Sequence, residues 1–163
     1  MRRFTAYFDR LQQVYETANN PQIRELALGL LSEFRDPTPE RRALAYAVSG
    51  EVRNQDAITQ FRTPLGQRQT RNLAWDFIRQ NWSQVQGQFT SWTGASLVGA
   101  TSDFCSEQKN QEVVGFLTAH PAPASTNSLE RAEDLINDCA QRRGRIWRSG
   151  RRAGRGRANL VRY

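Results

Sequence analysis

The stretch that decides the fold reads Asn72-Leu73-Ala74-Trp75-Asp76-Phe77-Ile78-Arg79-Gln80-Asn81-Trp82. Its apolar side chains recur every three or four positions, as they do along the buried face of an amphipathic helix. The stripe consists of Leu73, Ala74, Phe77, Ile78 and Trp82, with Trp75 flanking it. The spacing of seven puts both tryptophans on one side of a helix. We therefore expect a core role for them rather than ligand stacking.

The same helical period continues on both sides of this stretch. Apolar stripes lie in residues 4–15, 23–34, 44–48, 107–117 and 129–140. Proline- and glycine-marked breaks separate them, and at one break we expect Thr38 to cap the next helix with Pro39 in its first position. No strand alternation or hairpin signal is present, and the Gly-, Ser- and Thr-rich segment 87–101 has the weakest helical pattern. The sequence predicts an all-α fold of antiparallel helix pairs, in a bundle or a superhelical stack.

Length and composition exclude several classes of protein. The chain has 163 residues, a mean hydropathy of −0.71 and two cysteines. No apolar run approaches the roughly 18 residues that span a bilayer, and Met1-Arg2-Arg3 does not open a signal peptide. Two cysteines are too few for a disulfide scaffold and weakly indicate a reducing compartment. We expect one domain, no membrane partner and a cytoplasmic location.

The net charge of +7 is unevenly distributed along the chain. Residues 142–163 hold nine arginines and no acidic residue, whereas residues 1–141 hold 14 basic and 16 acidic residues. The basicity therefore belongs to the C-terminal tail, and the remainder lacks the excess of positive charge that grips phosphates.

No set of residues predicts catalysis or metal binding. The chain has a single histidine, His120, which we expect to stabilise the carbonyls at a helix end. Cys105 and Cys139 lack the C-x-x-C spacing, and Cys139 lies on an apolar helix face, where a small buried hydrophobe is expected. A nucleophile elbow is absent. The sequence predicts no catalytic residue, no metal ligand and no cofactor in this chain.

Three stretches, in order, carry a family resemblance. They are residues 49–56 (SGEVRNQD), 72–82 (NLAWDFIRQNW) and 112–117 (EVVGFL). Their order and spacing resemble the C-terminal helical domain, also called ERAP-like, of zinc metalloaminopeptidases of the aminopeptidase N family. The resemblance covers about residues 4–141, and the second stretch is its most specific part.

The resemblance implies a non-catalytic role. In that family, zinc and the HExxH motif belong to an earlier domain, and HExxH has no counterpart in this sequence. The helical domain forms a bowl of HEAT-like helix pairs that shapes the substrate cavity. Its implied partners are a peptide substrate and a zinc-bearing catalytic domain. The chain would start partway into that domain, as a solenoid truncated on its N-terminal side. The apolar face exposed there would favour self-association.

The resemblance also suggests a single substrate-binding residue, Arg53. Its guanidinium, in the VRNQD segment, would face the cavity and meet a peptide carboxylate. A structural ion pair with Asp56 is the alternative role, and we rank it first.

The tail, residues 142–163, has three interpretations. After a partly helical start it has the composition of a disordered basic arm, which would bind nucleic acid through its arginines and Trp147. It could instead be a solvated terminus without a partner, or a shifted reading frame of the family's usual ending. The alternative function is thus a stand-alone helical interaction module with a nucleic-acid-binding tail.

Overall fold

The computed structural model describes the backbone of residues 2–90 and 92–157, and the side chains of residues 6–90 and 92–146. The side chains of Phe4 and Trp147 therefore lie outside the described part. Every regular element in that part is a helix, which confirms the all-α prediction. The elements are α1 Arg2–Thr17, α2 Pro21–Leu31, α3 Pro37–Ala47, α4 Asn54–Gly66, α5 Arg71–Gln80, α6 Trp82–Gly87, α7 Thr93–Ala100, the 3-10 turn η1 Thr101–Asp103, α8 Glu107–Ala119 and α9 Thr126–Arg157.

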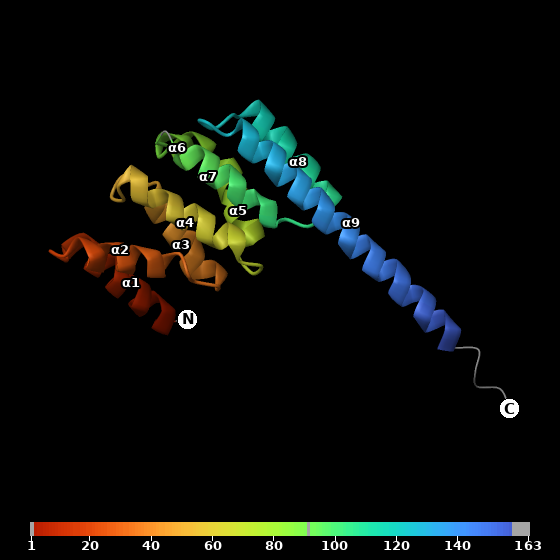
Figure 1. The fold of residues 1–163 in the computed structure, drawn as a ribbon. Coiled ribbons are helices and arrows are strands. Elements are labelled where there is room, and N and C mark those ends of the chain that lie inside the picture. The colour runs from red at the N-terminus through yellow and green to blue at the C-terminus, as the bar shows by residue number, and fades with distance from the viewer. Residues whose placement is uncertain (1, 91, 158–163) are drawn as a thin grey trace.

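The helices pack in two layers that follow the chain order (Figure 1). In one layer α1 contacts α3, and α3 contacts α5. In the other layer α2 contacts α4, α4 contacts α7, and α7 contacts α9. Pairs such as α1 with α2 and α8 with α9 join neighbours in sequence, because short loops return the chain antiparallel. The HEAT-like superhelical character and the N-terminal truncation stay predictions.

Side chains at the breaks between helices set where the next helix begins. Asn20 accepts a hydrogen bond from the N–H of Gln22, and Asp36 accepts one from the N–H of Thr38, both at 2.9 Å. The predicted cap was wrong by two residues, since Asp36 caps α3 and Pro37 takes its first position. A residue before proline favours the extended backbone, which is the conformation that a cap requires.

Two segments with helix-breaking residues are more helical than their composition indicates. Pro64 lies inside α4, whose last turn continues to Gly66. Beyond it, Arg71 donates hydrogen bonds to the carbonyls of Leu65 at 2.7 Å and Gly66 at 3.0 Å, which satisfies the helix end. In the segment with the weakest pattern, Gly94 sits in α7, where a Cβ atom would lie 2.8 Å from the carbonyl oxygen of Pro123. Only glycine permits this approach.

The two tryptophans of the opening stretch lie in the core, as predicted. Trp75 is fully buried and Trp82 is 9% exposed. Phe116 of α8 packs edge-on against both rings, at centroid distances of 5.5 Å and 5.3 Å. The Trp75 Nε1–H donates to Glu112 Oε1 at 2.7 Å, so α8 satisfies the one polar atom of the buried indole. The second and third stretches of the resemblance thus pack against each other.

The apolar stripe of α2 is buried only in part. Ala27, Leu28 and Leu31 lie in the core. Ile23, Leu26 and Leu30 are exposed, at 48%, 64% and 38%. We call these three residues the α2 face. From the resemblance we expected an exposed apolar face on the N-terminal side of the chain, and the α2 face is such a surface. Self-association through it stays a prediction.

The last helix, α9, runs far past the other helices (Figure 1). The sequence predicted helix only to about residue 148 and disorder beyond it, whereas the described backbone is helical to Arg157. Arginine and alanine are good helix formers, and they outnumber the glycines between residues 142 and 157. Residues 158–163 lie outside the described part.

Candidate functional site

Two hollows lie side by side on the layer formed by α2, α4 and α7. One, of about 490 Å³, lies between α2 and α4, and the other, of about 630 Å³, lies between α4, α7 and η1. Thr59 and Thr63 of α4 line both, so the two hollows adjoin at these residues and together make one concave surface across α2, α4 and α7. We call it the α4 groove.

The two ends of the α4 groove differ in chemistry. The first end combines Leu26 and Leu30 of the α2 face with the acidic side chains of Glu25 and Glu33. Arg62 and Asp103 line the second end, and neither forms an ion pair with a described residue. Four hydroxyls also line the groove without donating a hydrogen bond to another described residue: Thr59, Thr63, Ser96 and Ser102. Free donors, acceptors and both charge signs suit an extended peptide, whose backbone carries unpaired N–H and C=O groups.

Arg53, the predicted substrate-binding residue, does not line this groove. It precedes the first turn of α4, and its Nε donates to Asp56 Oδ2 at 2.6 Å. This hydrogen bond and the charge of Asp56 raise the pKa of the Arg53 guanidinium. The predicted structural pair is therefore present. Contact between Arg53 and a peptide stays a prediction.

The sequence did not indicate that α3 carries a buried carboxyl group. Glu40 is fully buried, and neither carboxyl oxygen has a hydrogen-bond partner. Burial, together with the negative charge of Glu33, raises the pKa of Glu40 from 4.5 to about 8. In the sequence Glu40 looks like an ordinary acidic residue in the first turn of a helix, so no signal distinguished it.

The two cysteines form a disulfide, which corrects the expectation of a buried free thiol at Cys139. Cys105 precedes α8 and Cys139 lies in α9, with their Cα atoms 5.1 Å apart. The partners are 34 residues apart in sequence. The pairing of α8 with α9 brings them together, a contact that spacing alone does not reveal.

The described residues offer no metal centre. No three His, Cys, Asp or Glu side chains among them lie close enough to hold an ion. The His120 ring hydrogen-bonds through Nδ1 to the Phe116 carbonyl at 3.0 Å, which confirms its predicted role at the helix end. Within the described part, no helix is long and apolar enough to cross a membrane.

Comparison with known proteins identifies relatives of this region. The model of the family described as "ERAP1-like C-terminal domain" matches residues 4–138. Aminopeptidase M1-B of Oryza sativa subsp. japonica is 28% identical over 143 residues, which cover 83% of this chain and 16% of the relative. Aminopeptidase M1 of Arabidopsis thaliana is 25% identical, over 80% of this chain and 15% of the relative. Aminopeptidase 2, mitochondrial, of Saccharomyces cerevisiae is 24% identical, over 82% of this chain and 14% of the relative. The chain thus spans about one-sixth of each relative.

Proposed function

Because the chain belongs to the ERAP1-like C-terminal domain family, we propose that it is the non-catalytic helical part of a zinc-dependent aminopeptidase. The observation that carries the proposal is the family match over residues 4–138, which includes every helix from α2 to α8. In this role the chain lines the substrate cavity and leaves hydrolysis to a zinc-bearing catalytic part. The described residues do not fit a zinc site, since they hold no cluster of three ligands.

The α4 groove supports the cavity-lining role. It offers free hydroxyls between an end with two leucines and two glutamates and an end with Arg62 and Asp103, which suits the backbone and side chains of a peptide. Arg53 would contribute by binding a peptide carboxylate once its pair with Asp56 opens. A bidentate contact to a carboxylate is the geometry in which arginine is strongest.

A binding experiment tests the association with a catalytic part. The full chain is titrated into rice Aminopeptidase M1-B from which the matching region has been removed. We expect a one-to-one complex and no peptidase activity from the chain alone with added zinc. Activity of the chain alone, or no binding at concentrations where the truncated enzyme is folded, would contradict the proposal.

A cytoplasmic location stays part of this proposal. The Cys105–Cys139 bond counts against this location, because disulfides are rare where thiols are kept reduced.

One observation favours the second candidate, a stand-alone module with a nucleic-acid-binding tail. Past residue 141 the basic segment continues as a helix beyond the rest of the body (Figure 1). The arginine side chains of this helix would neutralise phosphates along a nucleic acid. Deletion of residues 142–163 should then abolish binding to a duplex and its salt dependence. Binding that persists with the same salt slope would refute this function.

A further inference from the structure

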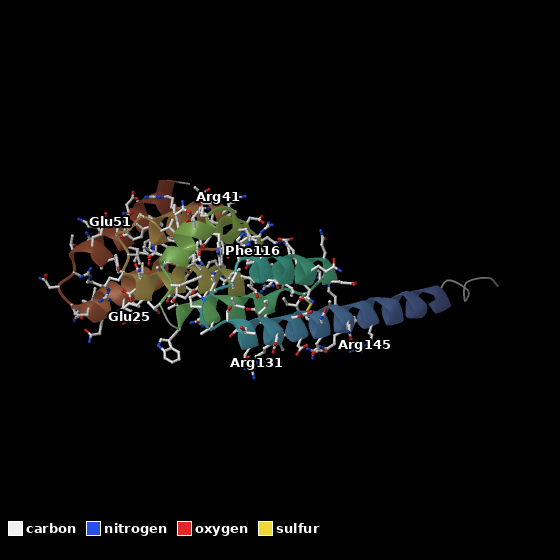
Figure 2. All side chains as sticks on the ribbon, turned by 90° about the horizontal axis from the view of Figure 1, so that it is seen from above. Glu25, Arg41, Glu51, Phe116, Arg131 and Arg145 are labelled. Carbon is white, nitrogen blue, oxygen red and sulfur yellow. A yellow bond between two sulfur atoms is a disulfide. The ribbon has the colours of Figure 1, made fainter. Side chains whose placement is uncertain are left out.

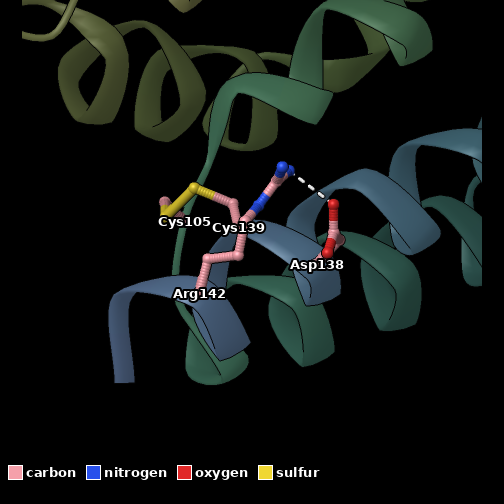
Figure 3. Close-up of a disulfide and its surroundings, with 4 residues drawn as sticks. All are labelled: Cys105, Asp138, Cys139 and Arg142. Atoms are coloured by element: carbon pink, nitrogen blue, oxygen red, sulfur yellow. Dashed lines mark ion pairs between the residues drawn. A yellow bond between two sulfur atoms is a disulfide. The ribbon is translucent and has the colours of Figure 1, made fainter. Parts of the chain in front are cut away.

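The disulfide stands at the place where α9 leaves the body of the molecule (Figure 3). Before the bond, Ala132 and Ile136 are buried in the core. After it, none of residues 140–146 is buried, and Gln141, Arg142 and Arg143 are exposed. Cys139 therefore lies in the last packed turn of α9.

The turn that follows Cys139 makes no polar side-chain contact with the described part of the body. Arg142 forms an ion pair with Asp138, but both belong to α9 (Figure 3). Among residues 139–145, no side chain forms an ion pair or side-chain hydrogen bond to another element. The nearest such bond precedes the turn, where Asn110 Nδ2 of α8 donates to Asn137 Oδ1 at 2.8 Å. The covalent bond is thus the tether of this turn.

The bond is also accessible. Both cysteines are half-buried, and a hollow of about 730 Å³ opens beside Cys105. Ser106 and Glu107 line one side of it, and Gln141, Arg143 and Gly144 line the other. The hollow gives a thiolate a route to the bond, and Arg143 on its wall supplies a positive charge that favours the approach of a thiolate.

We propose that the Cys105–Cys139 disulfide is a redox-sensitive clasp that fixes or releases α9 from Cys139 onward. The clasp is independent of the aminopeptidase role and goes beyond it. Its reaction partner is a dithiol. One thiolate of the dithiol attacks Cys105 Sγ, the S–S bond breaks and Cys139 leaves as a thiolate. The second thiol then resolves the mixed disulfide and releases Cys105. Two electrons and two protons pass to the protein, and the dithiol becomes a cyclic disulfide.

Reduction has a local consequence. The half of α9 before the bond stays in place, because Ala132 and Ile136 remain buried. The half after the bond has no buried side chain among residues 140–145, so no packed side chain there replaces the bond once it is reduced. The redox state thus sets how well ordered α9 is beyond Cys139, because a helical segment without packing contacts is only marginally stable in water.

Hydrogen exchange on the full chain, with and without dithiothreitol, tests the clasp. On reduction we expect two new titratable thiols and a fall of at least about tenfold in amide protection over residues 139–146, since closing a loop of this size favours contact strongly. Protection of α5 should stay unchanged.

In the Cys105→Ser/Cys139→Ser variant, dithiothreitol should have no effect. Arg143→Gln should slow the release of thiols by dithiothreitol, while Arg131→Gln, at an exposed arginine earlier in α9 (Figure 2), should not.

Three results would overturn the proposal. Two free thiols in protein equilibrated with oxidised glutathione would mean that the bond does not form. Unchanged protection of residues 139–146 after reduction would mean that the bond does not hold the turn. Loss of protection in α5 as well would make the disulfide a global stabiliser instead of a local clasp.

Discussion

Two apolar stripes with the same helical spacing end in opposite environments. The first contributes to what we call the Trp75 cluster, formed by Trp75, Trp82, Phe104, Phe116 and Glu112. There the apolar rings are packed edge-on, and Glu112 accepts bonds from Trp75 Nε1 and Lys109 Nζ. The second stripe leaves the α2 face outside, and nearby α3 carries Glu40, buried with no partner. In the first region both tryptophans are buried and the Glu112 carboxylate is paired, whereas the second leaves three apolar side chains exposed and one carboxyl group buried without a partner.

The difference shows what periodicity can predict. A stripe of apolar side chains indicates which side of a helix favours burial. It does not indicate whether another element of the same chain covers that side. In the Trp75 cluster α8 supplies the cover, while no described helix covers the α2 face. The α2 end is therefore the part of the molecule best suited to a further apolar surface.

The largest effect is expected in the Trp75 cluster. Trp75→Ala should lower the free energy of unfolding by about 3–5 kcal/mol, because it leaves a cavity among packed rings and removes the donor to Glu112. Urea denaturation measures this loss. Trp92→Ala is the matched control, since Trp92 is 82% exposed and should change stability little. Equal losses from the two variants would mean that the cluster is not the centre of the core.

The next largest effect is the dependence of stability on pH that the buried Glu40 carboxyl causes. Burial raises its pKa from 4.5, the ordinary value that applies to the unfolded chain, to about 8 in the folded chain, so the folded chain binds the proton more tightly. Below about pH 4.5 the Glu40 carboxyl is protonated in both states, so its ionisation does not lower the free energy of unfolding. Between pH 4.5 and pH 8 it ionises in the unfolded state alone, which lowers the free energy of unfolding by up to about 1.4 kcal/mol per pH unit. Glu40→Gln should remove this slope and stabilise the chain by a few kcal/mol at pH 8. Urea midpoints between pH 5 and 8 measure it.

Exposed Glu107 gives the control for that prediction. Glu107→Gln should leave the pH slope of the wild type in place, because this side chain is exposed to water. A wild-type chain that is equally stable at pH 5 and pH 8 would contradict the burial of an unpaired Glu40 carboxyl.

A smaller effect is expected for the polar part of the Trp75 cluster. Glu112→Gln keeps an oxygen for Trp75 Nε1 but removes the charge that pairs with Lys109 at 3.0 Å and Arg79 at 3.2 Å. These groups are part-exposed, so we expect a loss of only about 1 kcal/mol, which high salt should reduce. Thermal denaturation at low and high salt measures it. A loss as large as that of Trp75→Ala would show that charge dominates over packing here.

The smallest change in stability, but a clear change in association, is expected at the α2 face. Leu26→Glu removes an apolar side chain that is 64% exposed, so the free energy of unfolding should change by less than about 0.5 kcal/mol. Self-association of the wild-type chain, measured by sedimentation over a concentration series, should weaken in the variant. A wild type that stays monomeric at every concentration would show that the α2 face does not self-associate.

Local sequence signals predicted the helices well, because period and breaks act over a few residues. The stripe around Trp75 and the helix end at His120 are examples. Features that depend on contacts between distant segments were missed. The Cys105–Cys139 bond requires α8 to pair with α9, and the α4 groove requires α4 to lie between α2 and α7. Neither arrangement leaves a trace in local spacing, whereas Arg53 and Asp56 pair within one helical turn and were predicted as a pair.

The central claim is that this chain completes an aminopeptidase without carrying its chemistry. The most direct test measures hydrolysis of an aminoacyl-naphthylamide and of a peptide by truncated rice Aminopeptidase M1-B with the chain added. We predict that the chain restores peptide hydrolysis and that Thr63→Arg, in the α4 groove, weakens it, while Ser83→Arg, at an exposed position of α6, does not. Unrestored activity in a mixture that has formed the complex would contradict the claim.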